Sequence, residues 1–398
     1  MRVPPGRDVV LIAGGGFAAM EAALAVRAMA GERAHVCLVA PDPDFSFAPA
    51  ATRSAFAAAT GERMPMRELA ERAGAALIGG TLRDVRPDLR RIVLETGREL
   101  EYDHLVVAVG ARAEAWLTAP GVLFRGPRDE QALAGLLDEM VARAMAGERL
   151  RVVFAVPVGP GWAVPVYELA LLAAQWLTRH GVRDAVDLAV VTAEDEPLGV
   201  FGHDAAEAVT AELAEAGVEV HPGAVARTWA DGNLHVVPGG DLPADLVVSL
   251  PALRGPRVAG LPHTQLGFVA ADEAGRVVGS PGVYVAGDAG PFPVKQAGLA
   301  CQQADAVAAL IASEMGAHVP PHPGPPTLRA VLWTGRGDRF LRTDLAGGRD
   351  ESGGVGALTA ELWWPPGKVA GRFLTPFLQG EPDAARLVDL DVPEPRRG

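Results

Sequence analysis

Short apolar runs alternate with a helical pattern at the beginning of the chain. Residues 9–13 (VVLIA) form an apolar run of the kind that is buried in a parallel sheet. Three glycines follow it, and residues 18–30 then repeat apolar positions at the spacing of a helix. Residues 35–40 (HVCLVA) form the next apolar run, so strand, turn, helix and strand fit in about 32 residues. This order predicts a βαβ unit.

The alternation continues through the rest of the chain. The patterns predict a hairpin at 91–103, a strand at 105–109, a strand at 152–156, a helix at 164–180, a strand at 186–191, a helix at 204–216, strands at 245–250 and 283–286, a helix at 295–315 and a strand pair around 328–341. Residues 319–326 (VPPHPGPP) are predicted to form a stiff linker, because proline cannot continue a helix or a central strand.

Two rounds of alternation indicate an α/β protein with two Rossmann-like domains, the second inserted in the first, and a small C-terminal cap domain. We expect the first domain at residues 1–112 and 243–320, the inserted domain at 113–242 and the cap at 321–398. The cap has too few residues for a large core of its own.

The composition narrows the class of protein. With 49% hydrophobic and 21% charged residues, this chain of 398 residues is too apolar for a disordered region. A net charge of -13 disfavours nucleic acid and anionic membrane surfaces as partners. Glu21 interrupts the early apolar run that superficially resembles a signal peptide, and no run of about 18 apolar residues could span a membrane. We therefore expect a cytoplasmic protein with no nucleic-acid partner.

The chain lacks the residues for a metal centre or a disulfide scaffold. Two cysteines, Cys37 and Cys301, are too few for a disulfide framework, a four-cysteine zinc site or an iron–sulfur cluster. His318 and His322 have H-x3-H spacing, but the prolines around them forbid the helix that would bring them to one face. No metal site is predicted, so redox chemistry would need a bound organic cofactor.

The glycine-rich turn matches a dinucleotide fingerprint, Gly14-x-Gly16-x-x-Ala19, between a strand and a helix. Gly14 permits the tight turn, Gly16 lets the backbone approach a pyrophosphate, and Ala19 lets the helix pack on the strand. The helix N-terminus then offers free amides to the phosphates. We expect a dinucleotide cofactor here.

The second strand departs from this fingerprint at its end. An acid for the ribose hydroxyls is normally expected where this chain has Ala40 and Pro41. Asp42 or Asp44 could take that role, or the backbone alone could hold the ribose.

Three further segments resemble those of flavoproteins with two dinucleotide folds. They are residues 102–111 (YDHLVVAVGA), 282–288 (GVYVAGD) and 295–305 (KQAGLACQQAD). With the opening fingerprint they resemble the pyridine nucleotide-disulfide oxidoreductase superfamily. Within it, the chain most resembles sulfide:quinone oxidoreductases, flavocytochrome c sulfide dehydrogenase flavoproteins and type II NADH dehydrogenases. The resemblance covers about residues 9–315.

This resemblance implies FAD as the cofactor. The residues that it brings to FAD are Gly14, Gly16, Phe17, Ala18, Ala19, Ala40, Ala108, Gly110, Gly287, Asp288, Lys295, Gln296 and Ala297. The fingerprint residues are expected at the pyrophosphate, and Asp288 at ribityl or phosphate oxygens. A helix N-terminus near Lys295 would stabilise the anionic reduced flavin, by about 0.3–1 kcal/mol per charge.

Three residues are candidates for catalysis. The chain has only two lysines, and Lys295 at the mouth of the closing helix could place a compact charge at the flavin N1 and O2 edge. Glu168, on an otherwise apolar helix, lies either on a solvated face or near the flavin, where it could shuttle a proton. Cys301 could approach the flavin from the closing helix, whereas Cys37 is predicted to be a core residue. With no partner for Cys301, we expect no disulfide relay.

The second domain has a degenerate turn at residues 158–164 (VGPGWAV). Pro160 removes an amide from the phosphate cradle, Trp162 is bulky, and Val164 hinders close helix packing. NADH and NADPH are therefore expected to be poor donors, with an NAD(P)H-dependent reductase kept as an alternative. Sulfide-oxidising members of the resembled subgroup also have a degenerate turn here, followed by a Tyr-Glu or similar pair, and this chain has Tyr167-Glu168.

The C-terminal segment 362–378 (LWWPPGKVAGRFLTPFL) combines apolar residues with Lys368 and Arg372. It could lie at a membrane interface, as in relatives that reduce quinones, or pack on the flavin domain or at a homodimer contact. Three prolines leave too short a helix for a strong anchor, so packing is favoured.

These observations predict an FAD-dependent oxidoreductase. It would transfer hydride or electron pairs through flavin N5, from a small-molecule donor to an acceptor such as a quinone, without a disulfide relay. Beside the NAD(P)H-dependent alternative stands a flavoprotein that only transfers electrons to a protein partner.

Overall fold

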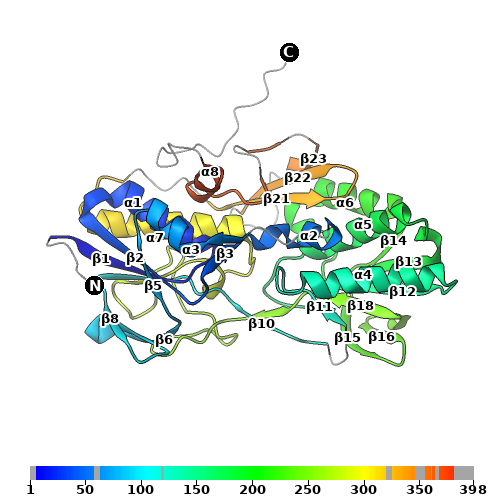
Figure 1. Cartoon of the computed structure of the whole chain (residues 1–398), viewed down its shortest axis with the longest axis horizontal. Helices are drawn as coiled ribbons and strands as arrows, with labels where there is room; N and C mark the ends of the chain where they lie inside the picture. Colours follow the sequence, from blue (N-terminus) through cyan, green and yellow to red (C-terminus); the bar gives the residue numbers. More distant parts are fainter. Residues whose placement is uncertain are drawn as a thin grey trace, which may run out of the picture.

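The structure is a computed structural model that describes residues 6–57, 63–117, 121–319, 325–345, 355–359, 361–363 and 367–380. Two lobes lie side by side, each built on a sheet with helices, and the C-terminal elements lie above both (Figure 1). This arrangement confirms the predicted α/β class with two Rossmann-like domains.

The first lobe contains a five-stranded parallel sheet in the order β20-β9-β1-β2-β5. Its strands are β1 (Asp8–Ala13), β2 (Ala34–Ala40), β5 (Ala76–Gly79), β9 (His104–Val107) and β20 (Val283–Val285). Helices α1 (Phe17–Ala30) and α7 (Ala297–Glu314) pack against each other on one face, and the antiparallel sheet of β6 (Leu82–Arg86), β7 (Arg91–Leu94) and β8 (Glu99–Glu101) packs on the other. Shorter elements of this part are β3 (Asp44–Ser46), β4 (Arg63–Pro65), α2 (Ala51–Ala57) and α3 (Met66–Arg72).

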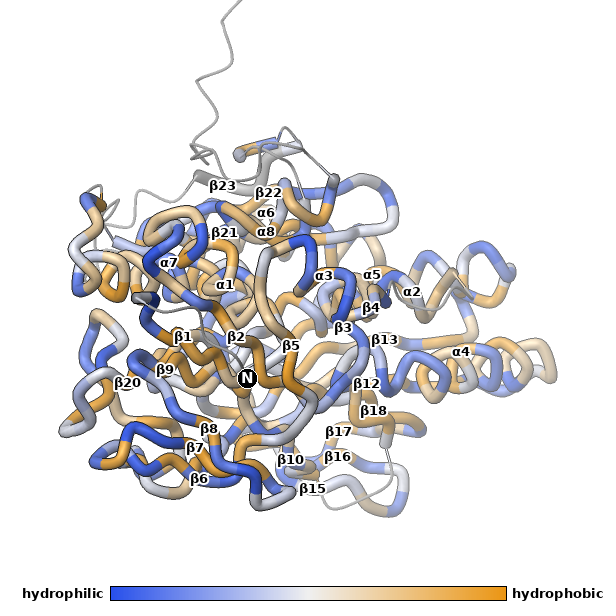
Figure 2. The backbone as a smooth tube through the Cα atoms, turned by 60° about the vertical axis from the view of Figure 1, so that its left-hand side comes forward, coloured by the Kyte–Doolittle hydropathy of each residue, from blue (hydrophilic) through white to orange (hydrophobic). Residues whose placement is uncertain are grey.

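Both faces of this sheet are covered, which explains the unbroken apolar run in β1. Val10 and Ile12 pack in the cluster with α1 and α7, whereas Leu11 and Ala13 pack toward the antiparallel sheet. All four are fully buried. The hydrophobic colour of β1, β2, β5 and β9 in the middle of this lobe shows the same pattern (Figure 2).

The second lobe contains a five-stranded parallel sheet in the order β11-β18-β12-β13-β14. Its strands are β11 (Val122–Leu123), β12 (Leu150–Ala155), β13 (Val186–Val191), β14 (Val218–His221) and β18 (Leu246–Ser249). Its helices are α4 (Glu130–Met145), α5 (Val164–Arg179) and α6 (His203–Glu215), and β15 (Val225–Ala230), β16 (Asn233–Val237) and β17 (Gly240–Pro243) form a small antiparallel sheet. Strands β10 (Arg112–Glu114) and β19 (Ala252–Arg254) pair antiparallel where the chain passes between the lobes.

One predicted boundary is wrong. We expected residue 243 to begin the return to the first domain, but β18 lies inside the second sheet, paired with β12 and β11. The return comes at β19, about ten residues later. A short apolar run such as residues 245–250 fits either parallel sheet, and only its pairing decides which one it joins.

The C-terminal part bridges the lobes. Strands β21 (Thr327–Trp333), β22 (Asp338–Asp344) and β23 (Val355–Leu358) form an antiparallel sheet, which includes the predicted strand pair, and β21 contacts both α5 and α7. Helix α8 (Leu374–Leu378) packs on α1. Residues 320–324 of the predicted linker, which include His322, lie outside the described residues.

The aromatic residues near the C-terminus pack inside the protein. Trp363, Phe373 and Phe377 are buried, and the ring of Trp363 lies 5.3 Å from that of Phe340. Packing is the interpretation that the sequence favoured for this segment, although residues 364–366 lie outside the described part. Among the described helices, none is both long enough and apolar enough to cross a bilayer.

Candidate functional site

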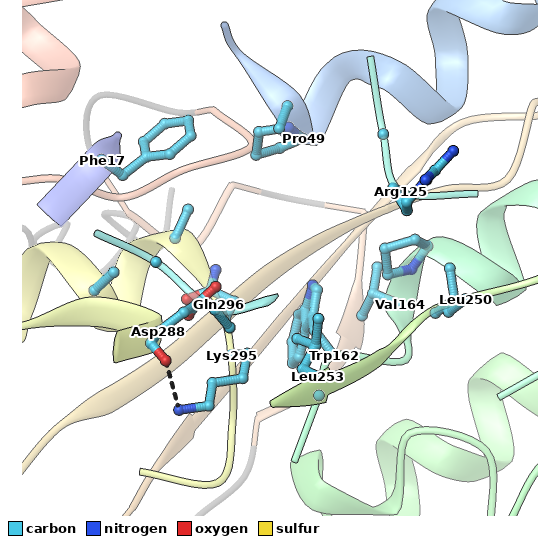
Figure 3. Close-up of a pocket in the computed structure, with 18 of the residues that line it drawn as sticks. Phe17, Pro49, Arg125, Trp162, Val164, Leu250, Leu253, Asp288, Lys295 and Gln296 are labelled. Carbon is cyan, nitrogen blue, oxygen red and sulfur yellow. Dashed lines mark hydrogen bonds between the residues drawn. The ribbon is translucent and has the colours of Figure 1, made fainter. Parts of the chain in front are cut away.

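A cavity of about 470 Å³ lies where the two lobes and the C-terminal part meet. This volume is in the range of small-molecule and cofactor sites. The lining includes Gly16, Phe17 and Ala18 of the fingerprint, Ala108, Gly110, Gly287, Asp288, Lys295, Gln296 and Ala297 from the rest of the first lobe, Trp162, Val164, Glu168 and Leu250 from the second, and Lys368. Many of these side chains are drawn in Figure 3.

The fingerprint turn has the geometry of a phosphate cradle. Gly14 has φ +144°, and a Cβ there would lie 2.1 Å from the Ala108 carbonyl oxygen, so only glycine fits. Gly16 has an extended conformation that any residue could adopt, and a Cβ there would meet nothing within 4 Å. Gly16 therefore keeps space open at the N-terminus of α1, as a bound pyrophosphate requires.

Two predicted cofactor contacts lie behind the cavity wall. Ala19 is fully buried and packs helix α1 on the sheet, which is the packing role that the fingerprint predicts. Ala40 at the end of β2 lies against Gly15, behind the turn, and it does not line the cavity. Neither Asp42, which is exposed, nor Asp44 lines it.

Lys295 and Asp288 form the wall near the start of α7, and Figure 3 shows the lysine reaching toward Asp288. The Lys295 ammonium donates to the backbone carbonyls of Asp288 (3.2 Å) and Gly290 (2.6 Å), and lies 4.0 Å from the centre of the Phe268 ring. Burial lowers the pKa of Lys295 to about 8, and burial raises the pKa of Asp288 against the opposing effect of the Lys295 charge. The ammonium thus fixes the Asp288 turn while placing a positive charge beside the cavity.

Gln296 caps the closing helix. Its side-chain oxygen accepts a hydrogen bond from the Leu299 amide (2.8 Å), and its amide group donates to the Arg329 carbonyl (3.1 Å) in β21. The N-terminus of α7 is therefore fixed against the C-terminal sheet while Ala297 and Ala300 line the cavity.

Glu168 is fully buried at the cavity and lies on no solvated face. It accepts hydrogen bonds from the Thr52 hydroxyl (2.8 Å) and the Trp333 amide (2.9 Å), and it forms an ion pair with Lys368. The Lys368 ammonium also donates to the Val331 carbonyl (2.6 Å) and lies 4.2 Å from the centre of the Trp333 ring. Burial lowers the pKa of Lys368, which Glu168 opposes.

Both cysteines lie away from this cavity. Cys37 packs in the cluster between the sheet and its antiparallel cover, whereas Cys301 packs with α1 and α7 on the opposite face. Burial raises the pKa of Cys37 to about 11 and that of Cys301 well above its ordinary value. Thiols separated by a sheet cannot form a disulfide with each other, and neither thiol lines the cavity. The structure therefore does not support Cys301 as a residue that approaches the cofactor.

The family model for pyridine nucleotide-disulphide oxidoreductases matches residues 8–304. The chain belongs to this family. Its members are FAD-dependent oxidoreductases, and FAD is the cofactor of this protein. The open space at Gly16, the start of α1 and the N-terminus of α7 fit that cofactor.

Among the relatives, the chain is similar to the sulfide-quinone reductase of Aquifex aeolicus, with 24% identity over 271 residues. That alignment covers 63% of this chain and 59% of the relative. The solved sulfide:quinone oxidoreductase of Aquifex aeolicus has a TM-score of 0.77 and 19% identity, covering 87% of this chain and 86% of that one. A ferredoxin reductase from Rhodopseudomonas palustris has a TM-score of 0.66 and 20% identity, covering 87% and 84%.

In this protein, the glycine turn of the second lobe (residues 158–164) is hydrogen-bonded to the first lobe. The Gly161 amide donates to the Pro293 carbonyl, and the Lys295 amide donates to the Gly161 carbonyl, both at 3.0 Å. Trp162 lines the cavity and packs edge-on against Phe201. An amide that a dinucleotide phosphate would need is thus already used, in addition to the one that Pro160 lacks.

Sequence reasoning missed Lys368 and Thr52 as site residues. The chain has two lysines among 36 basic residues, and the structure brings both of them to the cavity. Their scarcity was the one available signal for Lys368. Thr52 carries no such signal, because it reaches Glu168 through the packing of α2 on α5. Within the described residues, no group of three or more His, Cys, Asp or Glu side chains could hold a metal ion.

Proposed function

We propose that this flavoprotein transfers an electron pair from a small-molecule donor to an acceptor such as a quinone, without a disulfide relay. The observation that carries the proposal is the location of both cysteines outside the cavity, on opposite faces of the first sheet. The similarity to sulfide-quinone reductase supports quinone-type acceptors as the first to test.

The residues around the cavity have different proposed roles. When bound, FAD supplies the redox chemistry, and the protein supplies position and charge. Gly16, Phe17 and Ala18 are suited to hold the pyrophosphate, and Asp288 is suited to accept hydrogen bonds from hydroxyl groups. The N-terminus of α7 and the Lys295 ammonium favour negative charge nearby, which supports reduction.

The buried pair of Glu168 and Lys368 is suited to proton exchange. Transfer of an electron pair to a flavin is accompanied by proton uptake. A side chain that donates this proton must be able to lose it at a small cost in free energy. Burial weakens the hold of Lys368 Nζ on its proton, and Glu168 Oε1 is directly hydrogen-bonded to that nitrogen. We infer that Lys368 Nζ and Glu168 Oε1 hold and move this proton.

The donor is unlike NADH or NADPH in this proposal. Pro160 lacks an amide, the Gly161 amide is bonded to Pro293, and Trp162 occupies part of the space. Each missing hydrogen bond to a charged phosphate weakens binding by about 1.5–3 kcal/mol, or about ten- to a hundredfold. Trp162 and Leu253 line the cavity on this side, and Val164 and Leu250 lie further along with Arg125 next to them (Figure 3). This largely apolar wall suits a small molecule.

An anaerobic reduction screen tests the proposal. The FAD-loaded protein is mixed in a stopped-flow instrument with NADH, NADPH, sulfide or a thiol, flavin bleaching is followed, and a quinone is then added as acceptor. We expect no saturable reduction by either nucleotide below about millimolar concentration. Saturable reduction at micromolar nucleotide would refute the donor assignment and favour the NAD(P)H-dependent alternative. Reduction that requires an added electron-transfer protein would favour the flavoprotein that serves a protein partner.

A further inference from the structure

A buried acid on the fingerprint helix binds the C-terminal segment. Glu21 of α1 is fully buried, and its two carboxyl oxygens accept hydrogen bonds from the amides of Phe373 (2.8 Å) and Leu374 (2.6 Å). These amides stand at the start of α8, more than 350 positions along the chain. The mechanism proposed above makes no use of Glu21.

A second buried acid faces Glu21 from the neighbouring helix. Asp305 of α7 is buried next to Glu21, and burial raises the pKa of both carboxyl groups. Asp305 Oδ1 has no hydrogen-bond partner among the described residues. Two buried carboxylates side by side cannot both be charged at low cost, and a proton held between them removes that cost.

The surroundings of this pair belong to three elements. Glu21 comes from α1, and the Cys301 thiol and Asp305 come from α7. The C-terminal segment contributes the Arg372 charge, which faces Asp305, and the Thr375 hydroxyl, which accepts from the Gly371 amide and donates to the Val369 carbonyl. The two backbone amides and the Arg372 charge are therefore suited to one negative charge on the pair.

The C-terminal segment that Glu21 binds also contains Lys368, which lines the cavity. Lys368 precedes Gly371 by three residues, and a Cβ at Gly371 would lie 3.0 Å from Glu21 Oε2 and 3.1 Å from Cys301 Sγ. This close approach fixes the backbone just after the lysine, and Arg72 of α3 adds a hydrogen bond to the Phe377 carbonyl (2.9 Å) at the other end.

We propose that Glu21 and Asp305 are positioning residues: a carboxyl pair with one shared proton that fastens residues 367–380 to the first lobe and thereby holds Lys368 at the cavity. The inference rests on the proposed function only for the role of Lys368. The fastening itself depends on the contacts of Glu21 and Asp305 and can be tested separately.

A shared proton makes the attachment of residues 367–380 sensitive to pH. A carboxyl group whose pKa is raised in the folded state adds stability that is present at low pH and is lost as the pH rises through the raised value. Loss of the shared proton would place two negative charges side by side in a buried site. The segment should therefore loosen as the pH rises above the ordinary carboxylate range.

The scarcity of lysine provides a selective assay. A lysine-specific protease can cut this chain only after Lys295 and Lys368, and cleavage after Lys368 releases residues 369–398. Both side chains are buried, so the rate of cleavage reports local opening of each site. Cleavage after Lys295 serves as the internal reference for the first lobe.

Three variants define the test on the FAD-loaded protein. Glu21→Gln keeps the size of the side chain but cannot offer two charged acceptors to the amides of Phe373 and Leu374. Asp305→Asn keeps a neutral hydrogen-bond donor toward Glu21 at every pH. The matched control is Glu314→Gln, which removes a carboxylate of α7 that bonds the Tyr284 hydroxyl.

We expect Glu21→Gln to accelerate cleavage after Lys368 by about ten- to a hundredfold, with Lys295 cleavage unchanged. Asp305→Asn should be cleaved like the wild type at the low end of the pH range, where the wild-type pair keeps its proton. The wild-type rate, corrected for protease activity on an unfolded substrate, should rise as the pH is increased above the ordinary carboxylate range, and Asp305→Asn should abolish this rise. Wild-type rates in Glu21→Gln, or an equal rise with pH in Asp305→Asn, would overturn the proposal.

The flavin midpoint potential separates this proposal from the proposed function. If Lys368 acts at the cavity, Glu21→Gln should shift the potential in the same direction as Lys368→Met, and Glu314→Gln should not. Rapid cleavage in Glu21→Gln with an unchanged potential would support the fastening by Glu21 and count against the role of Lys368.

Discussion

The ion pair of Glu168 and Lys368 offers a direct test of how the second lobe and the C-terminal segment meet. Glu168 is fully buried and the Lys368 side chain is 10% exposed. Lys368→Met would leave the carboxylate with the Thr52 hydroxyl and the Trp333 amide but no cation. Breaking one side of a buried ion pair destabilises a protein by about 3–5 kcal/mol, because the other charge stays buried without its partner.

Removing both charges should be much milder. In Glu168→Gln/Lys368→Met, the amide oxygen can still accept from the Trp333 amide, and the side-chain NH2 group can donate to the Thr52 hydroxyl oxygen. Methionine fills most of the volume of the lysine stem. We expect the double variant to lie within about 1–2 kcal/mol of the wild type, which implies a coupling of several kcal/mol between the two sites. An exposed pair, Arg91 with Glu101, is the matched control, and its coupling should stay below about 1 kcal/mol.

The assay is the thermal midpoint of the FAD-loaded proteins, followed by the release of flavin fluorescence. The predicted order is wild type, then the double variant, then both single variants well below. Additive effects, in which the double variant is as unstable as the two single variants combined, would refute the reasoning. Single variants no worse than those of the exposed control pair would refute it as well.

Further predictions concern the turn, the closing helix and the thiols. Gly16→Val should fold but fail to retain FAD, which the flavin content of the purified protein measures. Gly14→Ala should lower the thermal midpoint of the protein, because backbone strain of about 1–3 kcal/mol adds to the collision with Ala108. Circular dichroism measures that midpoint. Lys295→Met should lower the flavin midpoint potential, and its difference from the wild type should fade above about pH 8, where the ammonium loses its proton; an equal potential at pH 7 would make Lys295 purely structural. Serine in place of Cys37 and Cys301 should change flavin reduction by less than about tenfold, or 1.4 kcal/mol, and a thousandfold loss in a stopped-flow measurement would restore a role for a thiol.

Much of the first lobe could be predicted because its signals are local. The strand, the turn and the start of α1 follow one another directly, and the roles of Gly14 and Gly16 depend on neighbouring backbone. The degenerate turn of the second domain was also visible in Pro160 and Trp162. Local chemistry of this kind predicts a cofactor site without any knowledge of distant contacts.

The remainder of the site depends on contacts that no local pattern contains. Lys368 reaches Glu168 across 200 positions, and an apolar segment with one lysine is equally typical of a membrane interface. Glu21 interrupts an apolar run in the sequence, yet its partners at the start of α8 lie at the other end of the chain. Whether Cys301 approaches the cofactor depends on which face of α7 lines the cavity. Ala297 and Ala300 line the cavity, and Cys301 does not.

An anaerobic reductive titration of the purified protein tests the central claim most directly, since it needs no knowledge of the natural donor. Dithionite is added in steps while the flavin spectrum and the free thiols are followed. We expect one electron pair per FAD to complete the reduction, both in the wild type and in the variant with serine at positions 37 and 301. Uptake of a second electron pair in the wild type, lost in that variant, would show a redox-active disulfide and contradict electron transfer without a relay.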